Sequence, residues 1–201
     1  MFSINSFEHN NIIAIEPIFR SLVEAYVEFY NLSSDKKYGN YMECAYHAQW
    51  IKVLKEAQNN DNPYLKAMGD NEETIKSLDE HEAELDKLKK DGYSPLNIFR
   101  RFELAGMENE YRSVYNFLSN ESHSNIRALI SRHFEIDIKH KTFNVVFYKN
   151  WTLEEYSHYI IDSANYLLKA GEQLHEILKT GLTDIFHPLY KELETINSHS
   201  E

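Results

Sequence analysis

Cysteine, glycine and proline are scarce in this 201-residue chain, with one, six and four copies. The single cysteine, Cys44, excludes an internal disulfide and a site built from several thiolates. None of the glycines forms a phosphate-cradling loop, and no H-E-x-x-H motif or dense set of His and carboxylate ligands is present. The sequence therefore predicts neither a cofactor nor a metal site.

Long hydrophobic runs are also missing. No apolar stretch approaches the roughly 20 residues that span a bilayer. Residues 1–11 lack both the basic start and the apolar core of a signal peptide. We therefore expect no membrane span, no export and a cytoplasmic location.

Positive charge is in deficit, because the formal net charge is −11. That balance weighs against a broad nucleic-acid groove, which needs a positive surface. The basic residues are unevenly distributed: five of the six arginines fall between Arg100 and Arg132, where there is no lysine. Guanidinium grips phosphate or carboxylate through two parallel bonds, which ammonium cannot do. A local anion site and a structural arginine network are both open interpretations of this window.

Helical periodicity dominates the chain and predicts one helical domain over residues 1–201, with its core at about 15–197. The helices are expected at about 16–31, 41–58, 72–90, 107–120 and from 126 onward, followed by a long helix ending at Gly181 and a last one starting near Pro188. In the short helix after residue 125, the aliphatic residues Ile126, Leu129 and Ile130 are expected to face inward.

The 72–90 segment is highly charged and carries only a thin apolar stripe, so it cannot be buried on many sides. We interpret it as a projecting arm or as the outer layer of a bundle. A solvated helix and a helix that binds a protein partner are the two alternatives for its role.

The periodicity changes after the arginine window. Apolar and polar residues alternate from Phe134 to Ile138 and again from Phe143 to Phe147, which predicts one β-hairpin at about 134–148 that turns at His140-Lys141. The predicted fold class is therefore mainly α, a helical bundle with one small hairpin.

Two sets of residues could carry chemistry. Arg20 and Glu24 lie four apart and share a helix face; a surface ion pair is the simpler interpretation. Tyr115, Ser119 and His123 form an i, i+4 row that ends in an imidazole, the side chain best suited to proton transfer near neutral pH. The simpler interpretation of His123 is a helix-end cap or a hydrogen bond to a neighbour.

These two motifs together resemble a family. Arg20-Ser-Leu-Val-Glu24 and Tyr115-Asn-Phe-Leu-Ser119-Asn-Glu-Ser-His123 are similar to the R-x-x-x-E and Y-x-x-L-S-x-x-x-H pair of an uncharacterised bacterial domain-of-unknown-function family. The resemblance covers roughly residues 15–180. That family looks distantly related to the HEPN helical bundles, many of which are RNA-cleaving toxins or phage-defence effectors that act as dimers.

The resemblance implies a HEPN-like bundle, a homodimer, and a metal-independent ribonuclease or a nucleotide-binding protein in stress or phage defence. His123 would then be catalytic, with Arg112 and Arg127 binding the anion and Arg20, Glu24, Tyr115 and Ser119 substrate-binding or supporting. HEPN nucleases use an R-x(4–6)-H motif. Residues 127–133 have this spacing, with Ala128 where a polar residue usually stands. The competing class is a non-enzymatic interaction or scaffold protein whose 72–90 helix docks a partner.

Overall fold

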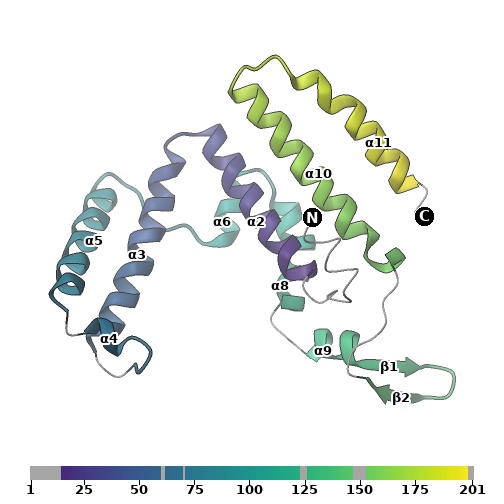
Figure 1. Cartoon of the computed structure of the whole chain (residues 1–201), viewed down its shortest axis with the longest axis horizontal. Helices are drawn as coiled ribbons and strands as arrows, with labels where there is room; N and C mark the ends of the chain where they lie inside the picture. Colours follow the sequence, from purple (N-terminus) through teal and green to yellow (C-terminus); the bar gives the residue numbers. More distant parts are fainter. Residues whose placement is uncertain (1–14, 60–61, 70, 123–125, 147–152, 199–201) are drawn as a thin grey trace. The chain divides into compact units, whose positions relative to one another are not determined.

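The structure is a computed structural model that describes residues 15–59, 62–69, 71–122, 126–146 and 153–198. This part of the chain is mainly helical, with a single two-stranded antiparallel hairpin, which confirms the predicted fold class. The chain divides into two compact units, one of residues 1–30 and 105–201 and the other of residues 31–104. The prediction of one domain over residues 1–201 stays a prediction, and the units are described separately below (Figure 1).

The 31–104 unit is built on two antiparallel helices, α3 (Tyr38–Gln58) and α5 (Glu72–Lys90), with the shorter α4 (Lys66–Gly69) and α6 (Ile98–Leu104) (Figure 1). Cys44 of α3 is fully buried against Leu85 and Leu88 of α5. Burial raises the pKa of the Cys44 thiol, so the group stays protonated and serves packing.

The charged helix predicted at 72–90 is α5, and it packs against α3; its role as a projecting arm or as an outer layer stays a prediction. Asn71 caps its start by accepting a hydrogen bond from the Glu73 amide at 2.9 Å, and acidic residues in the first turn with lysines in the last complement the helix dipole. Leu78, Leu85 and Leu88 are buried. Glu82, which interrupts that stripe in the sequence, pairs with Lys55 of α3 at 2.6 Å.

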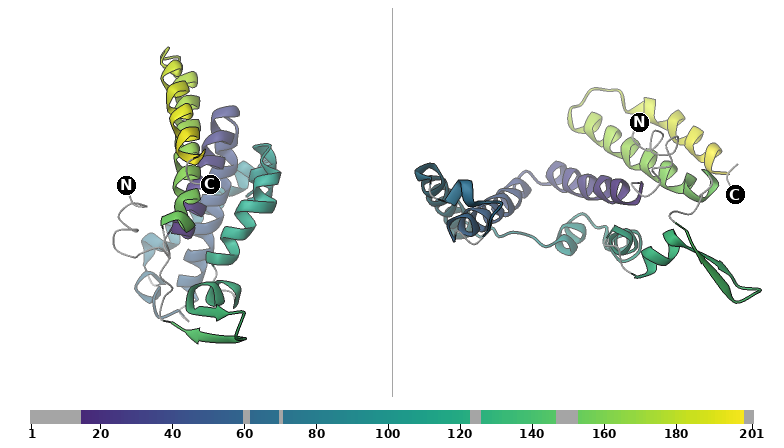
Figure 2. Two further views of the ribbon diagram at one scale, coloured as in Figure 1. Left: turned by 90° about the vertical axis from the view of Figure 1, so that its right-hand side faces the viewer. Right: turned by 60° about the horizontal axis from the view of Figure 1, so that its bottom comes forward.

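The other unit contains α2 (Ile15–Ser34) as far as Tyr30. Its C-terminal part consists of the long α10 (Leu153–Ile177), a short 3₁₀ turn η3 (Thr183–Ile185) and α11 (Phe186–Ser198). Ile15, Phe19, Val23 and Val27 repeat every fourth residue along α2 and are all buried. Phe19 meets the ring of Tyr159 on α10 at 5.6 Å between centroids. The views of Figure 2 show α10 alongside α11.

The same unit also contains four shorter elements that precede α10 in the chain. They are α7 (Glu108–Glu110), a π-helical turn η2 (Tyr111–Tyr115), α8 (Asn116–Ser122) and α9 (Ile126–His133). The regular helix predicted at 107–120 is therefore wrong in its middle, where the backbone widens into a π turn. The inward placement of Ile126, Leu129 and Ile130 is also wrong, because all three are exposed. The inner side of α9 instead carries the fully buried Ala128 and, one turn later, Arg132, which is held by an ion pair to α2.

The predicted hairpin is present as β1 (Phe134–Asp137) and β2 (Thr142–Val145), paired antiparallel with Phe134 opposite Val145. The expected turn at His140-Lys141 is confirmed. Asp137 accepts hydrogen bonds from the His140 amide at 3.0 Å and from its ring at 2.6 Å, and Lys141 adopts a positive φ of 53°. Residues 147 and 148 of the predicted range lie outside the described residues.

Candidate functional site

The first candidate site is a closed hydrogen-bonded cluster of Arg20, Glu24 and Tyr115. Arg20 donates from Nε to Glu24 Oε1 at 2.9 Å and from Nη2 to the Tyr115 hydroxyl at 2.9 Å. The hydroxyl in turn donates to Glu24 Oε1 at 3.0 Å. These bonds join α2 directly to the turn that carries Tyr115. The Arg20 and Glu24 side chains are 22% and 37% exposed, so the cluster is reachable from solvent.

The net effect of burial and hydrogen bonding in the cluster is to raise the pKa values of both Tyr115 and Arg20. Burial raises the pKa of Tyr115; the Arg20 bond lowers it and the Glu24 bond raises it again. Partial burial lowers the pKa of Arg20, but its bonds to Tyr115 and Glu24 outweigh that effect and the net direction is upward. Tyr115 is therefore a neutral phenol that donates a hydrogen bond, and it is no general base.

The backbone around Tyr115 is unusual. Tyr115 is the last residue of the π turn η2, and π insertions occur frequently at functional sites. The wider turn brings the Tyr111 ring onto the Tyr115 ring, 5.4 Å between centroids and 17° from parallel. The Arg20 guanidinium carbon lies 5.1 Å from the Tyr115 ring centroid. The π turn η2 therefore ends at a member of the Arg20–Glu24–Tyr115 cluster.

The remaining predicted site residues are only partly placed. Ser119 is half-buried on α8, one turn after Tyr115. Arg112 is exposed on η2, and within the described residues no ion pair joins it to a carboxylate. Arg127 belongs to α9, but its side chain is not among those described. His123 lies outside the described residues. Among the side chains that the structure describes, Arg20, Glu24 and Tyr115 are thus the predicted site residues that it joins.

A second cluster of the same composition was not predicted. Arg132 of α9 donates from Nη2 to Glu16 Oε2 of α2 at 2.6 Å, and the Tyr159 hydroxyl of α10 lies 3.5 Å from Glu16 Oε1. The Arg132 and Glu16 side chains are only 12% and 11% exposed. The crowding of arginines in the window was the one sequence signal for this cluster. It joins three helices and is closed to substrate.

The open interpretations of the arginine window can now be weighed residue by residue. Arg100 pairs with Glu103 in the same helix, Arg101 donates to the carbonyl of Leu96, and Arg132 pairs with Glu16. These three arginines form structural contacts. Arg112 is exposed and, within the described part of the chain, its side chain forms none of these structural contacts.

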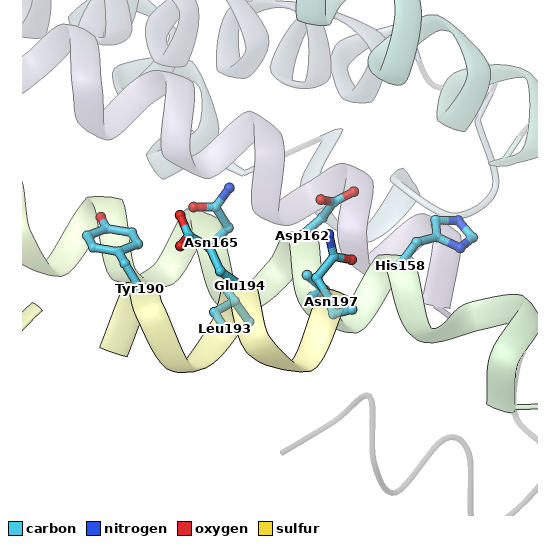
Figure 3. Close-up of a pocket in the computed structure, with 8 residues that line it drawn as sticks. His158, Asp162, Asn165, Tyr190, Leu193, Glu194 and Asn197 are labelled. Carbon is cyan, nitrogen blue, oxygen red and sulfur yellow. The ribbon is translucent and has the colours of Figure 1, made fainter. Parts of the chain in front are cut away.

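A third feature is a groove of about 250 Å³ between α10 and α11. Each helix contributes polar residues at i, i+4 and i+7, and Figure 3 shows them along the two helices: His158, Asp162 and Asn165 from α10, and Tyr190, Glu194 and Asn197 from α11. Polar residues at this spacing are typical of an ordinary solvated helix face, so no sequence pattern singles them out.

Two groups in or beside this groove have shifted pKa values. Reduced hydration raises the pKa of Asp162, while the charges of His158 and Lys169 lower it. Burial raises the pKa of Tyr190 to about 12, helped by its hydrogen bond to Glu172 at 3.0 Å.

Metal and membrane chemistry find no support in the described part of the chain. There, no three or more His, Cys, Asp or Glu side chains gather closely enough to hold a metal ion. No described helix is both long enough and apolar enough to cross a membrane.

Comparison with known proteins gives one match, to a family of unknown function, DUF5677, over residues 3–141. No curated protein and no solved structure matches the chain. The matched segment contains the Arg20–Glu24–Tyr115 cluster and every residue predicted for the site, whereas the α10–α11 groove lies beyond it. Since the match covers well over half of the sequence, the chain belongs to the DUF5677 family.

Proposed function

We propose that this protein is a HEPN-like, metal-independent ribonuclease that acts as a homodimer in the cytoplasm, in stress or phage defence. The observation that supports the proposal most is the Arg20–Glu24–Tyr115 cluster at the π turn. It joins the two sequence motifs, 91 residues apart, in one solvent-accessible group. The helix α8 that starts directly after it carries Ser119 and leads toward His123.

The proposed reaction needs no metal. The ribose 2′-oxygen attacks the adjacent phosphorus and the bond from phosphorus to the 5′-oxygen breaks, which leaves a 2′,3′-cyclic phosphate and a 5′-hydroxyl. His123 takes the proton of the 2′-hydroxyl, and the departing 5′-oxygen takes a proton from solvent water, to which His123 then releases its own. Arg112, exposed on the turn that carries Tyr115, offers a guanidinium to the phosphate, and Arg127 is the second candidate for that role. Arg20, Glu24 and Tyr115 hold this turn in position.

The Arg127–His133 stretch is the less suitable motif for that chemistry, although its spacing matches R-x(4–6)-H. Ala128 is fully buried, and Arg132 is occupied by Glu16. Ala128 is therefore committed to packing and Arg132 to the ion pair. His123 is the better candidate for proton transfer.

The test is incubation of the pure protein with total RNA and, separately, with single-stranded DNA, each with and without EDTA. The proposal predicts cleavage of RNA only, unchanged by EDTA, with cyclic phosphate ends on the products. Cleavage of DNA, or loss of activity in EDTA, contradicts it. RNA or nucleotide that binds without being cut indicates a nucleotide-binding protein on the same site.

A non-enzymatic interaction protein is the second candidate, and one observation favours it. Met42, Tyr46 and Trp50 follow one another every fourth residue on α3, and all three are exposed. Together with α5, this stripe of one methionine and two aromatic residues is the place where a protein partner would dock. A partner that co-purifies with the parent protein and is lost with Trp50→Ser, but retained with Tyr64→Ser at another exposed aromatic residue, supports this role. Retention in both variants contradicts it.

A further inference from the structure

The two helices of the 31–104 unit meet at an unusual pair of histidines. His47 of α3 and His81 of α5 approach with their Nδ1 atoms 2.8 Å apart. Trp50 lies parallel to the His81 ring, 2° between planes and 6.0 Å between centroids, and Tyr46 meets that ring edge-on at 5.7 Å. The pair is therefore held in place by aromatic rings from the neighbouring turns of α3.

A contact between two ring nitrogens at this distance is a hydrogen bond, so it needs one donor and one acceptor. Two neutral imidazoles satisfy it when one carries its proton on Nδ1 and the other on Nε2. A pair with one added proton satisfies it as well, because the imidazolium donates to the neutral ring. With two added protons both nitrogens are donors, no acceptor remains, and two positive charges face each other.

The groups around the two histidines determine the pH at which the second proton binds. Burial lowers the pKa of His81, the charge of His47 lowers it further, and Glu80 opposes both. Glu80 precedes His81 directly on α5, and Glu82 directly follows it and is paired with Lys55 of α3 at 2.6 Å. Since the neutral form of His81 is favoured in the folded protein, the unfolded chain binds more protons below the ordinary pKa of about 6.5. The stabilisation is therefore complete above that pH and is lost as the pH falls below it.

We propose that the His47–His81 contact is an acid-sensitive latch between α3 and α5, which opens when the pair takes up a second proton. The two helices pack over the small core of Cys44, Leu85 and Leu88, and Trp50 and Tyr46 lie over the latch itself. Opening loosens α5 from α3 and exposes this core. The inference depends on the 31–104 unit alone and is independent of the proposed ribonuclease activity.

The test is amide hydrogen exchange of the full-length protein between pH 7.5 and 5.0, corrected for the intrinsic pH dependence of exchange. The latch predicts that the opening equilibrium of the α3 and α5 amides increases about tenfold per pH unit once one proton is taken up on opening. His81→Gln should flatten this dependence, since a glutamine amide can bond His47 without titrating. His47→Gln should flatten it in the same way.

The matched control is His187→Gln, at an exposed position on α11, which should keep the full pH dependence in α3 and α5. The measured quantity is the slope of the opening equilibrium with pH. A variant that is less stable by the same amount at every pH therefore still tests the proposal. The latch is excluded if the parent shows no acid-dependent opening of these helices, or if the His81→Gln and His47→Gln proteins keep the slope of the parent.

Discussion

At the scale of single residues, α2 supplies a glutamate to each of two clusters of the same composition. Glu24 meets Arg20 and Tyr115, and Glu16, eight residues earlier, meets Arg132 and Tyr159. They differ in solvent access: the Glu24 side chain is 37% exposed and that of Glu16 is 11% exposed. The first can therefore meet a ligand, whereas the second holds helices together.

Breaking the buried cluster should lower the free energy of unfolding more than breaking an exposed ion pair. Arg132→Met leaves the Glu16 carboxylate buried without its cation, and removing one member of a buried ion pair costs about 3–5 kcal/mol. Arg100→Met removes an exposed pair within one helix, where the loss is small. Urea unfolding of both variants measures the difference. Equal stabilities would show that the Glu16–Arg132 pair is no more buried in solution than the Arg100–Glu103 pair.

The open cluster should respond to the loss of a single oxygen atom. Tyr115→Phe removes the hydroxyl that links Arg20 to Glu24, so the free energy of unfolding should fall by about 1–2 kcal/mol. Tyr64→Phe, at an almost fully exposed tyrosine, should leave it unchanged. Both are compared by urea unfolding, and a Tyr115→Phe protein as stable as the control contradicts the hydrogen bonding described here.

At the scale of secondary structure, what was predictable from the sequence was what repeats locally. The four-residue spacing of Phe19, Val23 and Val27 locates α2, and alternation locates the hairpin. The π turn was not predictable, because Tyr111 and Tyr115 fit a regular helix equally well. The buried side of α9 was also misjudged: an ion pair to Glu16, 116 residues away, turns Arg132 inward and leaves the aliphatic residues outside.

The candidate site was predictable to a similar extent. The pairing of Arg20 with Glu24 follows from their spacing, but no local pattern predicts their contact with Tyr115, more than 90 residues away. The α10–α11 groove has no local signature either. Its acidic and amide residues lie where solvent-facing residues of a helix are expected, and the groove becomes visible only when the two helices are side by side.

Two helical glycines should respond to alanine in opposite directions. A Cβ on Gly171 of α10 would lie 2.9 Å from Cε1 of Phe186, whereas on Gly39 of α3 its nearest neighbour would be Leu32 Cδ1 at 3.8 Å. Gly39→Ala should therefore gain about 0.5–1 kcal/mol of helix propensity. Gly171→Ala must displace the Phe186 ring, and overpacking of about 1–3 kcal/mol should make it net destabilising.

Thermal melting of the two glycine variants measures the sign directly. An increase in melting temperature for Gly39→Ala and a decrease for Gly171→Ala is the expected result. A Gly171→Ala protein that melts above the parent would show that α11 packs less tightly on α10 than described.

At the scale of the whole molecule, the net charge of −11 restricts how an RNA-directed protein of this kind could work. Broad attraction to phosphate is absent, so contact must be local, and the arginines near the π turn are the places where it can occur. A two-fold assembly would double that local charge at one surface.

Assembly has its own measurement. Light scattering of the pure protein at micromolar concentration should give about twice the 23.8 kDa chain mass. A monomer over the whole accessible concentration range contradicts the proposed homodimer, although it leaves the hydrogen-bonded cluster unaffected.

The central claim, proton transfer by His123, is tested most directly by the RNA cleavage rate and the melting temperature of His123→Ala, measured beside the parent and His187→Ala. We expect cleavage by the parent and by His187→Ala, a loss of about 10²–10⁴-fold in His123→Ala, and closely similar melting temperatures in all three. No cleavage by the parent, together with a clear fall in the melting temperature of His123→Ala, would contradict the account and leave His123 as a structural residue of an interaction protein.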